Sequence, residues 1–275
     1  MRIPRPTALM GLTAMALGAL MLSVGGCMKG NKPQLDVPPP PLAPPSDQYL
    51  AQLVEPVMIS EVADPSPLVD QRLVSGENGL GESLYVDCEP RLCRRTAQLL
   101  GQAQALAQQR GYFIVVVDAG RTPEAHEALV AMAGNPELVP APEEDKGYPD
   151  DRGAAVDVTL LDARNGDIEL AMGTRYMEMA EASNRRFPDL DREHISNRVA
   201  LTNIMTDSGF EEGPAWWDFH DPGWRRYPEM DDEDIDYTLS PAAEQALTEA
   251  RNPSLEEPTD LDAEAGQAET SEDAL

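Results

Sequence analysis

One stretch of this sequence decides the fold, and it reads Gly147-Tyr148-Pro149-Asp150-Asp151-Arg152-Gly153-Ala154-Ala155-Val156-Asp157-Val158-Thr159-Leu160. Its first half is rich in turn-forming residues and its second half is apolar and β-branched, so it predicts a tight loop that enters a strand. Gly153 allows a close backbone turn. The sequence therefore predicts two acidic side chains, Asp150 and Asp157, on either side of this turn.

The segments on both sides of this stretch predict an α+β domain. Tyr112–Asp118 is a continuous apolar, β-branched run, which predicts a strand buried on both faces, and the loop after it holds Arg121. The other elements that we expect are helices at 94–110, 124–132 and 192–208, strands at 156–161 and 215–220, and an antiparallel return at 168–172. Strands and helices do not alternate regularly, so we predict one domain with a small central, mainly antiparallel sheet packed by helices.

The beginning of the chain has the features of an export signal. Two arginines precede the uncharged run Ala8–Leu22, which is short for a bilayer span. Val24-Gly25-Gly26-Cys27 resembles a bacterial lipobox, whose cysteine is acylated and becomes the first residue of the mature protein. We therefore expect residues 1–26 to be a lipoprotein signal peptide and Cys27 to be the lipidation site. A plain signal peptide and a buried helix are the alternatives.

Composition divides the rest of the chain into three parts. Residues 27–47 start with the lipidated cysteine and are rich in proline, which predicts an extended tether. Residues 240–275 hold ten acidic residues, one basic residue and no aromatic residue, so we expect a disordered acidic tail. The domain then spans 48–239, which is long enough for a full hydrophobic core.

The chain is strongly acidic, with a formal net charge of −28. This charge disfavours nucleic acid and anionic lipid surfaces as partners. We expect a monomer that meets the membrane only through its lipid anchor. By resemblance to lipoprotein sorting rules, Met28 after the cysteine favours the outer membrane, with the domain in the cell envelope and facing the periplasm.

Two cysteines lie outside the lipobox, and they are Cys88 and Cys93. In an oxidising compartment, a pair so close in sequence predicts a local disulfide across a short turn. A zinc site at these cysteines is disfavoured because no third or fourth soft ligand is near them.

The stretch that starts at Gly147 resembles the Ser-x-His-x-x-Gly-x-Ala-x-Asp motif of the zinc D-alanyl-D-alanine dipeptidases and their carboxypeptidase relatives. Other segments resemble further motifs of that family in the same order, and they are Asn78–Tyr85, Asp118–Pro123 with Thr122 inserted, Met172–Thr174 and Ala215–Phe219. Their order and spacing cover nearly all of the domain. The resemblance implies the family's fold, with a peptidoglycan stem peptide or another small peptide as the partner.

The resemblance carries the active site over one residue at a time. The family's zinc ligands, a His, an Asp and a second His, fall on Asp150, Asp157 and Asp218. The Glu that activates water falls on Ala215. The Arg that steadies the reacting carbonyl group is present as Arg121, and the Asp of the same motif is Asp118. Two zinc-ligand positions and the general-base position are therefore changed.

These changes alter the chemistry that the site supports. Three carboxylates around one ion make an all-oxygen site, which suits Ca²⁺ or Mn²⁺ better than Zn²⁺. Without any cation the carboxylates would repel one another. The site therefore either binds a divalent metal or, with no metal, relies on a nearby arginine such as Arg121 or Arg152. Ala215 cannot accept a proton, so the family position offers no general base.

His220 offers a way to rebuild a metal site. On a strand it points to the same face as Asp218, so it is a further candidate ligand, with Glu211 or Glu212 as the base. The alternative is a surface histidine at a strand end. The remaining histidines are expected on solvated helix faces, and they are His126 and His194.

Two functions remain open. The first is an envelope lipoprotein with a catalytically degenerate dipeptidase-like domain that binds a cell-wall peptide or serves as a scaffold. The second is an active metallopeptidase that hydrolyses D-alanyl-D-alanine or a related cell-wall peptide with an altered ligand set. The first is favoured because the general base and two zinc ligands of the family are replaced.

Overall fold

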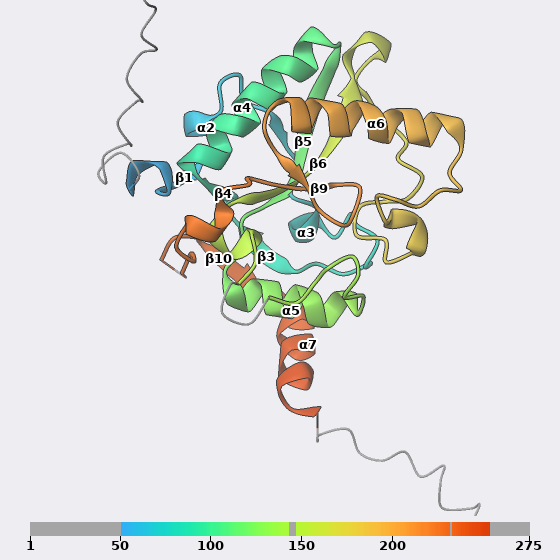
Figure 1. Cartoon of the computed structure of the whole chain (residues 1–275). Coiled ribbons are helices and arrows are strands. Elements are labelled where there is room, and N and C mark those ends of the chain that lie inside the picture. The colour runs from blue at the N-terminus through green and yellow to red at the C-terminus, as the bar shows by residue number, and fades with distance from the viewer. Residues whose placement is uncertain (1–50, 143–146, 232, 254–275) are drawn as a thin grey trace, which may run out of the picture. The chain divides into compact units, whose positions relative to one another are not determined.

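The computed structural model describes residues 51–142, 147–231 and 233–253 (Figure 1). In chain order the elements are β1 (Pro56–Met58), α2 (Ile59–Val62), β2 (Leu68–Val69), α3 (Arg72–Ser75), β3 (Tyr85–Cys88), β4 (Arg91–Cys93), α4 (Arg94–Gln109), β5 (Tyr112–Ala119), α5 (Pro123–Ala133), η1 (Asp150–Arg152), β6 (Ala155–Asp162), η2 (Ala163–Asn165), β7 (Ile168–Glu169), η3 (Glu181–Ser183), α6 (Arg192–Asp207), β8 (Glu211–Glu212), β9 (Asp218–His220), η4 (Trp224–Arg226), β10 (Tyr237–Leu239) and α7 (Pro241–Arg251). The elements labelled η are short 3-10 turns.

The largest sheet in the described part of the chain has the strand order β2-β5-β6-β9-β8, with β7 paired to β6 beside that path. β2 and β5 run parallel, and the other described pairs of this sheet run antiparallel. The two long strands β5 and β6 are buried along most of their length, as their β-branched sequences require. The predicted α+β class with a mainly antiparallel sheet is confirmed.

Helices cover the sheet in two groups. In Figure 1, α4 and α6 lie together at the top of the view and α5 and α7 at the bottom, with the strands between them. The apolar stripe of α4 faces the core, because Leu99, Leu100, Ala103 and Ala107 are all buried. α4 packs against β5. The strands β5, β6 and β9 are neighbours in the sheet, and the functional site described below lies along them.

The C-terminal region corrects one prediction, because the disordered tail does not begin at residue 240. Ser240 caps α7 by accepting a hydrogen bond from the backbone nitrogen of Ala243, and a proline follows at the first helical position. Ala243 and Leu247 are buried, and Arg251 pairs with Glu127 of α5 at 2.6 Å. The composition of 240–275 hid an amphipathic helix that belongs to the domain. The remainder of the predicted tail lies outside the described residues.

The predicted disulfide is also wrong, because the two cysteines are free and buried. Cys88 ends β3 and lies opposite Tyr237 of β10, whereas Cys93 ends β4 and lies opposite Pro56 of β1. The Sγ atom of Cys93 is 3.1 Å from Oγ1 of Thr96. The two strands belong to different small sheets, so closeness in sequence does not bring the thiols together.

The predicted strand of residues 215–220 is shorter in the structure, since β9 covers Asp218–His220 alone. The signal peptide, the lipobox with Cys27 and the tether lie outside the described residues. No helix in the described ranges is long and apolar enough to span a membrane.

Candidate functional site

Aspartates lie side by side across the central sheet. Asp118 at the end of β5 is directly opposite Asp157 of β6, and Asp157 is directly opposite Asp218 of β9. The register of β5 shifts between Val116 and Asp118, and this bulge puts Asp118 rather than Val117 opposite Asp157. Side chains of directly opposite residues share one face of a sheet. Three carboxyl groups are therefore gathered on one face.

A fourth carboxyl group reaches the same place from the loop before β6. Asp150 opens η1, and Gly153 ends this turn with a φ of 59°. A Cβ atom on Gly153 would lie 2.7 Å from the backbone nitrogen of Cys93, so only glycine fits. The backbone nitrogen of Arg121 donates to the carbonyl of Asp150 at 3.0 Å, which fixes the loop beside the end of β5. We call Asp118, Asp150, Asp157 and Asp218 the carboxylate cluster.

The guanidinium group of Arg121 is buried within the carboxylate cluster. Its Nη1 donates to Asp118 Oδ2 at 2.8 Å, and its Nη2 donates to Asp150 Oδ1. Asp157 accepts a hydrogen bond of 2.9 Å from the hydroxyl group of Tyr176. Burial alone would lower the pKa of Arg121, but Asp150, Asp118 and Asp157 together raise it well above its ordinary value. Arg121 therefore stays charged and balances part of the negative charge.

Protons balance another part of that charge. Burial raises the pKa of Asp118 to about 6, although Arg121 acts in the opposite direction. Burial and the nearby Asp150 raise the pKa of Asp218 to about 7, against Arg185 and Arg121. Burial also raises the pKa of Asp157 well above its ordinary value. Near neutral pH the cluster is thus partly protonated, which reduces the repulsion among its members.

The carboxylate cluster borders a nearly filled space, which we call the inner pocket. Its lining includes Arg121, His126, Tyr148, Asp150, Asp157 and Asp218. The volume of the inner pocket is about 10 Å³, which is roughly the room that one water molecule needs. The ring of Tyr148 packs on that of His126 with the centroids 4.6 Å apart. A dipeptide does not fit into the inner pocket in this conformation.

His126 is completely buried, so the expectation of a solvated helix face is wrong for this residue. Its Nε2 atom lies 3.0 Å from the carbonyl oxygen of Pro140, and its Nδ1 atom lies 3.8 Å from Asp151 Oδ1. Burial, together with the charge of Arg121, lowers the pKa of His126 to about 4. The imidazole is therefore neutral near pH 7 and donates from Nε2 to Pro140.

Ala215, at the family's general-base position, is buried and has no group that could take a proton. Its carbonyl oxygen accepts a hydrogen bond of 2.8 Å from Nη2 of Arg185. The neighbouring Gly213 gives Asp218 its space, because a Cβ atom there would come within 1.8 Å of Asp218 Oδ2. The segment from Gly213 to Asp218 is thus built around one carboxyl group, with no second one at position 215.

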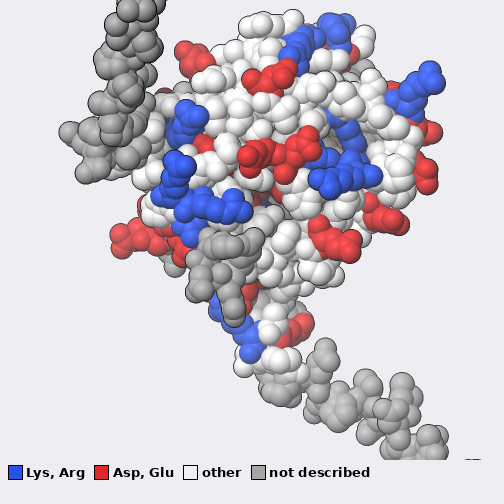
Figure 2. Space-filling view, viewed as in Figure 1, with Lys and Arg blue, Asp and Glu red and all other residues white. Residues whose placement is uncertain are grey.

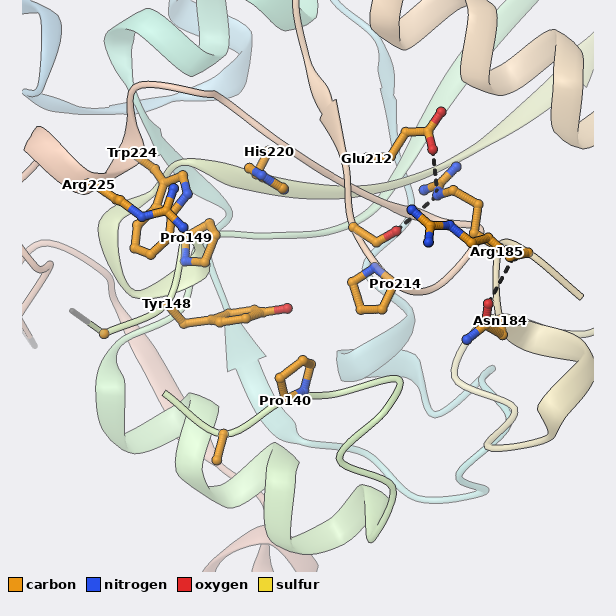
Figure 3. A pocket seen from close by; sticks show the side chains of 14 residues that line it. Pro140, Tyr148, Pro149, Asn184, Arg185, Glu212, Pro214, His220, Trp224 and Arg225 are labelled. Atoms are coloured by element: carbon orange, nitrogen blue, oxygen red, sulfur yellow. Dashed lines mark hydrogen bonds and ion pairs between the residues drawn. The ribbon is translucent and has the colours of Figure 1, made fainter. Parts of the chain in front are cut away.

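The structure does not bring His220 to the carboxylate cluster. His220 lines a larger hollow, which we call the outer pocket (Figure 3). Its Nε2 atom lies 3.5 Å from Glu211 Oε2 of the neighbouring strand β8. Burial lowers the pKa of His220. The candidate base Glu212 instead lies 3.9 Å from Nε of Arg185. The rebuilt metal site that the sequence suggested is therefore not assembled.

Sequence reasoning missed two aromatic residues of the site. Tyr148 separates the inner pocket from the outer pocket, and Tyr176 holds Asp157 through its hydroxyl group. Tyr148 occupies the serine position of the family motif, two residues before Asp150. A large aromatic side chain in place of a small one was the signal of a filled cleft. Tyr176 lies in a segment without regular structure, where no periodicity points to its direction.

The domain has a mainly antiparallel sheet with an acidic cluster at its strand ends, and comparison with known proteins gives its family. The family model described as D-ala-D-ala dipeptidase matches residues 69–237, which is more than half of the chain. The chain therefore belongs to the D-alanyl-D-alanine dipeptidase family.

Two relatives support this assignment, and both are D-alanyl-D-alanine dipeptidases. The one from Escherichia coli (strain K12) is 29% identical over 170 residues, which cover 62% of this chain and 86% of the relative. The one from Enterococcus faecium is 29% identical over 140 residues, which cover 45% of this chain and 69% of the relative.

The residues present do not fit the zinc ion that is typical of this family. The three ligand positions carry only carboxylate oxygens, whereas zinc sites in proteins are built with His or Cys ligands. A guanidinium group is already bonded to one of these carboxylates, that of Asp150. Among the described residues, no group of three or more His, Cys, Asp and Glu side chains is arranged to hold a metal ion.

Proposed function

We propose that this chain is an envelope lipoprotein whose dipeptidase-like domain has lost the hydrolytic chemistry of its family and binds a short cell-wall peptide. The observation that carries the proposal is the position of Arg121. Its guanidinium group is buried and bonded to Asp118 and Asp150, so a positive charge of the chain itself balances part of the charge of the cluster. A guanidinium group, unlike a metal ion, has no coordination position at which it could bind and activate water.

The other parts of a hydrolytic site also argue against turnover. Peptide hydrolysis needs a base that takes a proton from water, and Ala215 offers none. The inner pocket has a volume of about 10 Å³, so a peptide bond cannot approach the carboxylate cluster in this conformation. Binding without hydrolysis is therefore the function that the geometry supports best.

The location in the envelope rests on the sequence of the N-terminal region. The lipobox-like segment that ends at Cys27 and the proline-rich residues after it would tether the domain to a membrane. Met28 favours the outer membrane, and a cell-wall peptide is a ligand that such a protein would meet in the periplasm.

Activity and metal content of the mature protein test the proposal. We expect no release of D-alanine from D-alanyl-D-alanine with added Zn²⁺, and less than one zinc per chain by elemental analysis. The Escherichia coli relative serves as the positive control in the same assay. The triple variant Asp150→His, Ala215→Glu, Asp218→His should gain zinc, because it restores the nitrogen ligands and the base. Zinc-dependent turnover by the unmodified protein would overturn the proposal.

The second candidate is a metallopeptidase with an altered ligand set, and the pairing of His220 with Glu211 favours it. His220 lies on β9, the strand that also holds Asp218, and Glu211 lies on the neighbouring strand β8. A shift of this end of the two strands would therefore carry a nitrogen ligand and a carboxylate toward the cluster. Turnover that His220→Ala abolishes would establish this candidate. If the unmodified protein shows no measurable turnover, the first candidate stands.

A further inference from the structure

The outer pocket is large enough for a small ligand, with a volume of about 550 Å³. Segments from three parts of the chain form its walls, and they contribute Tyr148, Arg185, Arg186, Glu212, His220 and Arg225 among others. Figure 3 shows Trp224 and Arg225 on one side of the hollow, Arg185 and Pro214 on the other, and Tyr148 between them. Ligand pockets of proteins have volumes of about 300–1,000 Å³, so this hollow lies within their range.

Tyr148 makes the outer pocket a separate site. It is the residue that lines both pockets, and its ring stands between them. Burial, with Asp218 and Asp150 nearby, raises the pKa of Tyr148 well above its ordinary value, so its hydroxyl group stays neutral. A ligand in the outer pocket would thus contact the outer side of Tyr148 without reaching the carboxylate cluster.

The arginines of the outer pocket differ in what they already bind. Arg185 is occupied, because it donates to the carbonyl oxygens of Gly213, Ala215 and Asp218. Arg186 and Arg225 are exposed, and no carboxylate of the described residues lies within ion-pair distance of either. On the face seen in Figure 2, basic side chains lie on both sides of an acidic band.

Arg225 is held in a geometry that suits a carboxylate ligand. Its guanidinium carbon lies 4.3 Å from the centroid of the Trp224 ring, and Trp224 is itself buried. Stacking on an aromatic face fixes the plane of the guanidinium group and leaves its N–H edge for a planar anion. His220, which lines the same pocket, is neutral near pH 7 because burial lowers its pKa, so it does not compete as a cation.

We propose that the outer pocket binds a short peptide through a free carboxylate, with Arg225 as the recognising group. This inference rests on the proposed function, because it gives the peptide-binding role a location and a charge. The apolar part of the peptide would lie against Tyr148 and Trp224. A charge-assisted hydrogen bond to a carboxylate changes the affinity by about tenfold or more, which is enough to distinguish an acid from an amide.

Calorimetric titration of the mature protein tests the charge requirement. The probe is N-acetyl-D-alanyl-D-alanine, and the matched probe is its C-terminal amide, which has the same shape without the negative charge. We expect the acid to bind about tenfold or more tightly than the amide. Equal binding of acid and amide would overturn the proposal.

Single substitutions locate the site. Arg225→Gln should weaken binding of the acid about tenfold, with binding of the amide unaffected. Arg226→Gln is the matched control, because Arg226 is exposed and follows Arg225 in η4 but does not line the pocket. An equal loss in Arg226→Gln would show that only the overall charge matters, and the proposal would be wrong.

Two further arms separate this inference from its neighbours. Inorganic phosphate supplies an anion without a peptide; if it binds as tightly as the acid probe, the pocket is a bare anion site and the peptide assignment is wrong. Turnover of D-alanyl-D-alanine by the unmodified protein would defeat the proposed function, but the Arg225 and Arg226 variants would still show where the carboxylate binds. Absence of both turnover and binding would defeat this inference and would leave standing only the loss of hydrolysis in the proposed function.

Discussion

At the scale of single residues, Arg121 carries the charge balance of the carboxylate cluster. Replacement by methionine would leave buried carboxylates without their cation, and we expect a loss of about 3–5 kcal/mol in the free energy of unfolding. Millimolar Ca²⁺ or Mn²⁺ should recover part of that loss in Arg121→Met, because an all-oxygen cluster suits hard cations. Denaturant unfolding with and without the metal measures both effects.

The control for that prediction is Arg110→Met. Arg110 pairs with Asp207 on the surface at 2.6 Å, where such a pair contributes little. We expect a change of less than about 1 kcal/mol and no response to the metal. If both variants lose the same stability, then Arg121 does not hold the cluster together.

His126 makes a prediction about pH. Its pKa is lowered to about 4 in the folded protein from an ordinary value of 6.5, so the unfolded chain takes up a proton that the folded chain refuses. The stability that depends on neutral His126 is present above pH 6.5 and is lost as the pH falls toward 4. The wild-type protein should therefore lose about 2 kcal/mol more than His126→Gln between pH 7 and pH 4.5.

The matched variant is needed because the carboxylate cluster acts in the opposite direction. Asp118 and Asp218 have raised pKa values, so the stability linked to their protonation is present at low pH and is lost as the pH rises toward 6 and 7. Both proteins share that contribution, and it cancels in the difference. Glutamine keeps a donor for Pro140 but has no group that titrates. Parallel pH profiles of the two proteins would refute the prediction.

At the scale of elements, α7 is part of the folded domain. Leu247 is buried in the contact with α5, so Leu247→Ala should lower the free energy of unfolding by about 2–4 kcal/mol. Gln245→Ala, on the exposed side of the same helix, should change it by less than about 0.5 kcal/mol.

Truncation after Leu239 should lower the melting temperature, whereas truncation after Pro253 should not. Equal melting temperatures of the two truncated chains would contradict this assignment.

The long elements were predictable because their sequences allow one solution. The run Tyr112–Asp118 is apolar on both faces and rich in β-branched residues, which favours a central strand, and β5 covers Tyr112–Ala119. The helix expected at 94–110 is α4, which ends at Gln109, two residues before Gly111. α7 was missed because ten acidic residues dominate the composition of 240–275, while two buried side chains, Ala243 and Leu247, decide the packing.

The aspartates of the site could be predicted from the sequence, but the position of the arginine that neutralises part of their charge could not. The family resemblance placed Asp150, Asp157 and Asp218 at one site, and the sheet register brings two of them face to face. The direction of the Arg121 side chain depends on a bulge in β5 and on the loop around Asp150, and no local pattern encodes either. His126 did carry a signal, since helical spacing puts it on one face with Leu129 and Val130.

At the scale of the whole molecule, we propose that one side chain decides the position of the protein in the cell. Cys27→Ser removes the thiol that would be acylated, so we expect the protein to move from the membrane fraction to the soluble fraction of the envelope. Cell fractionation followed by immunoblotting measures this change. Substitution of Cys88, which is buried in the domain, is the control and should leave the protein with the membranes. Release of both variants, or of neither, would contradict the lipid anchor.

The buried Arg121 has a consequence for how the protein depends on its surroundings. A bound metal ion exchanges with the medium, so a metallopeptidase can lose its activity when a chelator removes the metal. The cation of this cluster is covalently part of the chain and cannot be withdrawn. Overnight dialysis against a chelator should therefore leave the melting temperature unchanged, and the domain would assemble in the same way in metal-poor as in metal-rich surroundings.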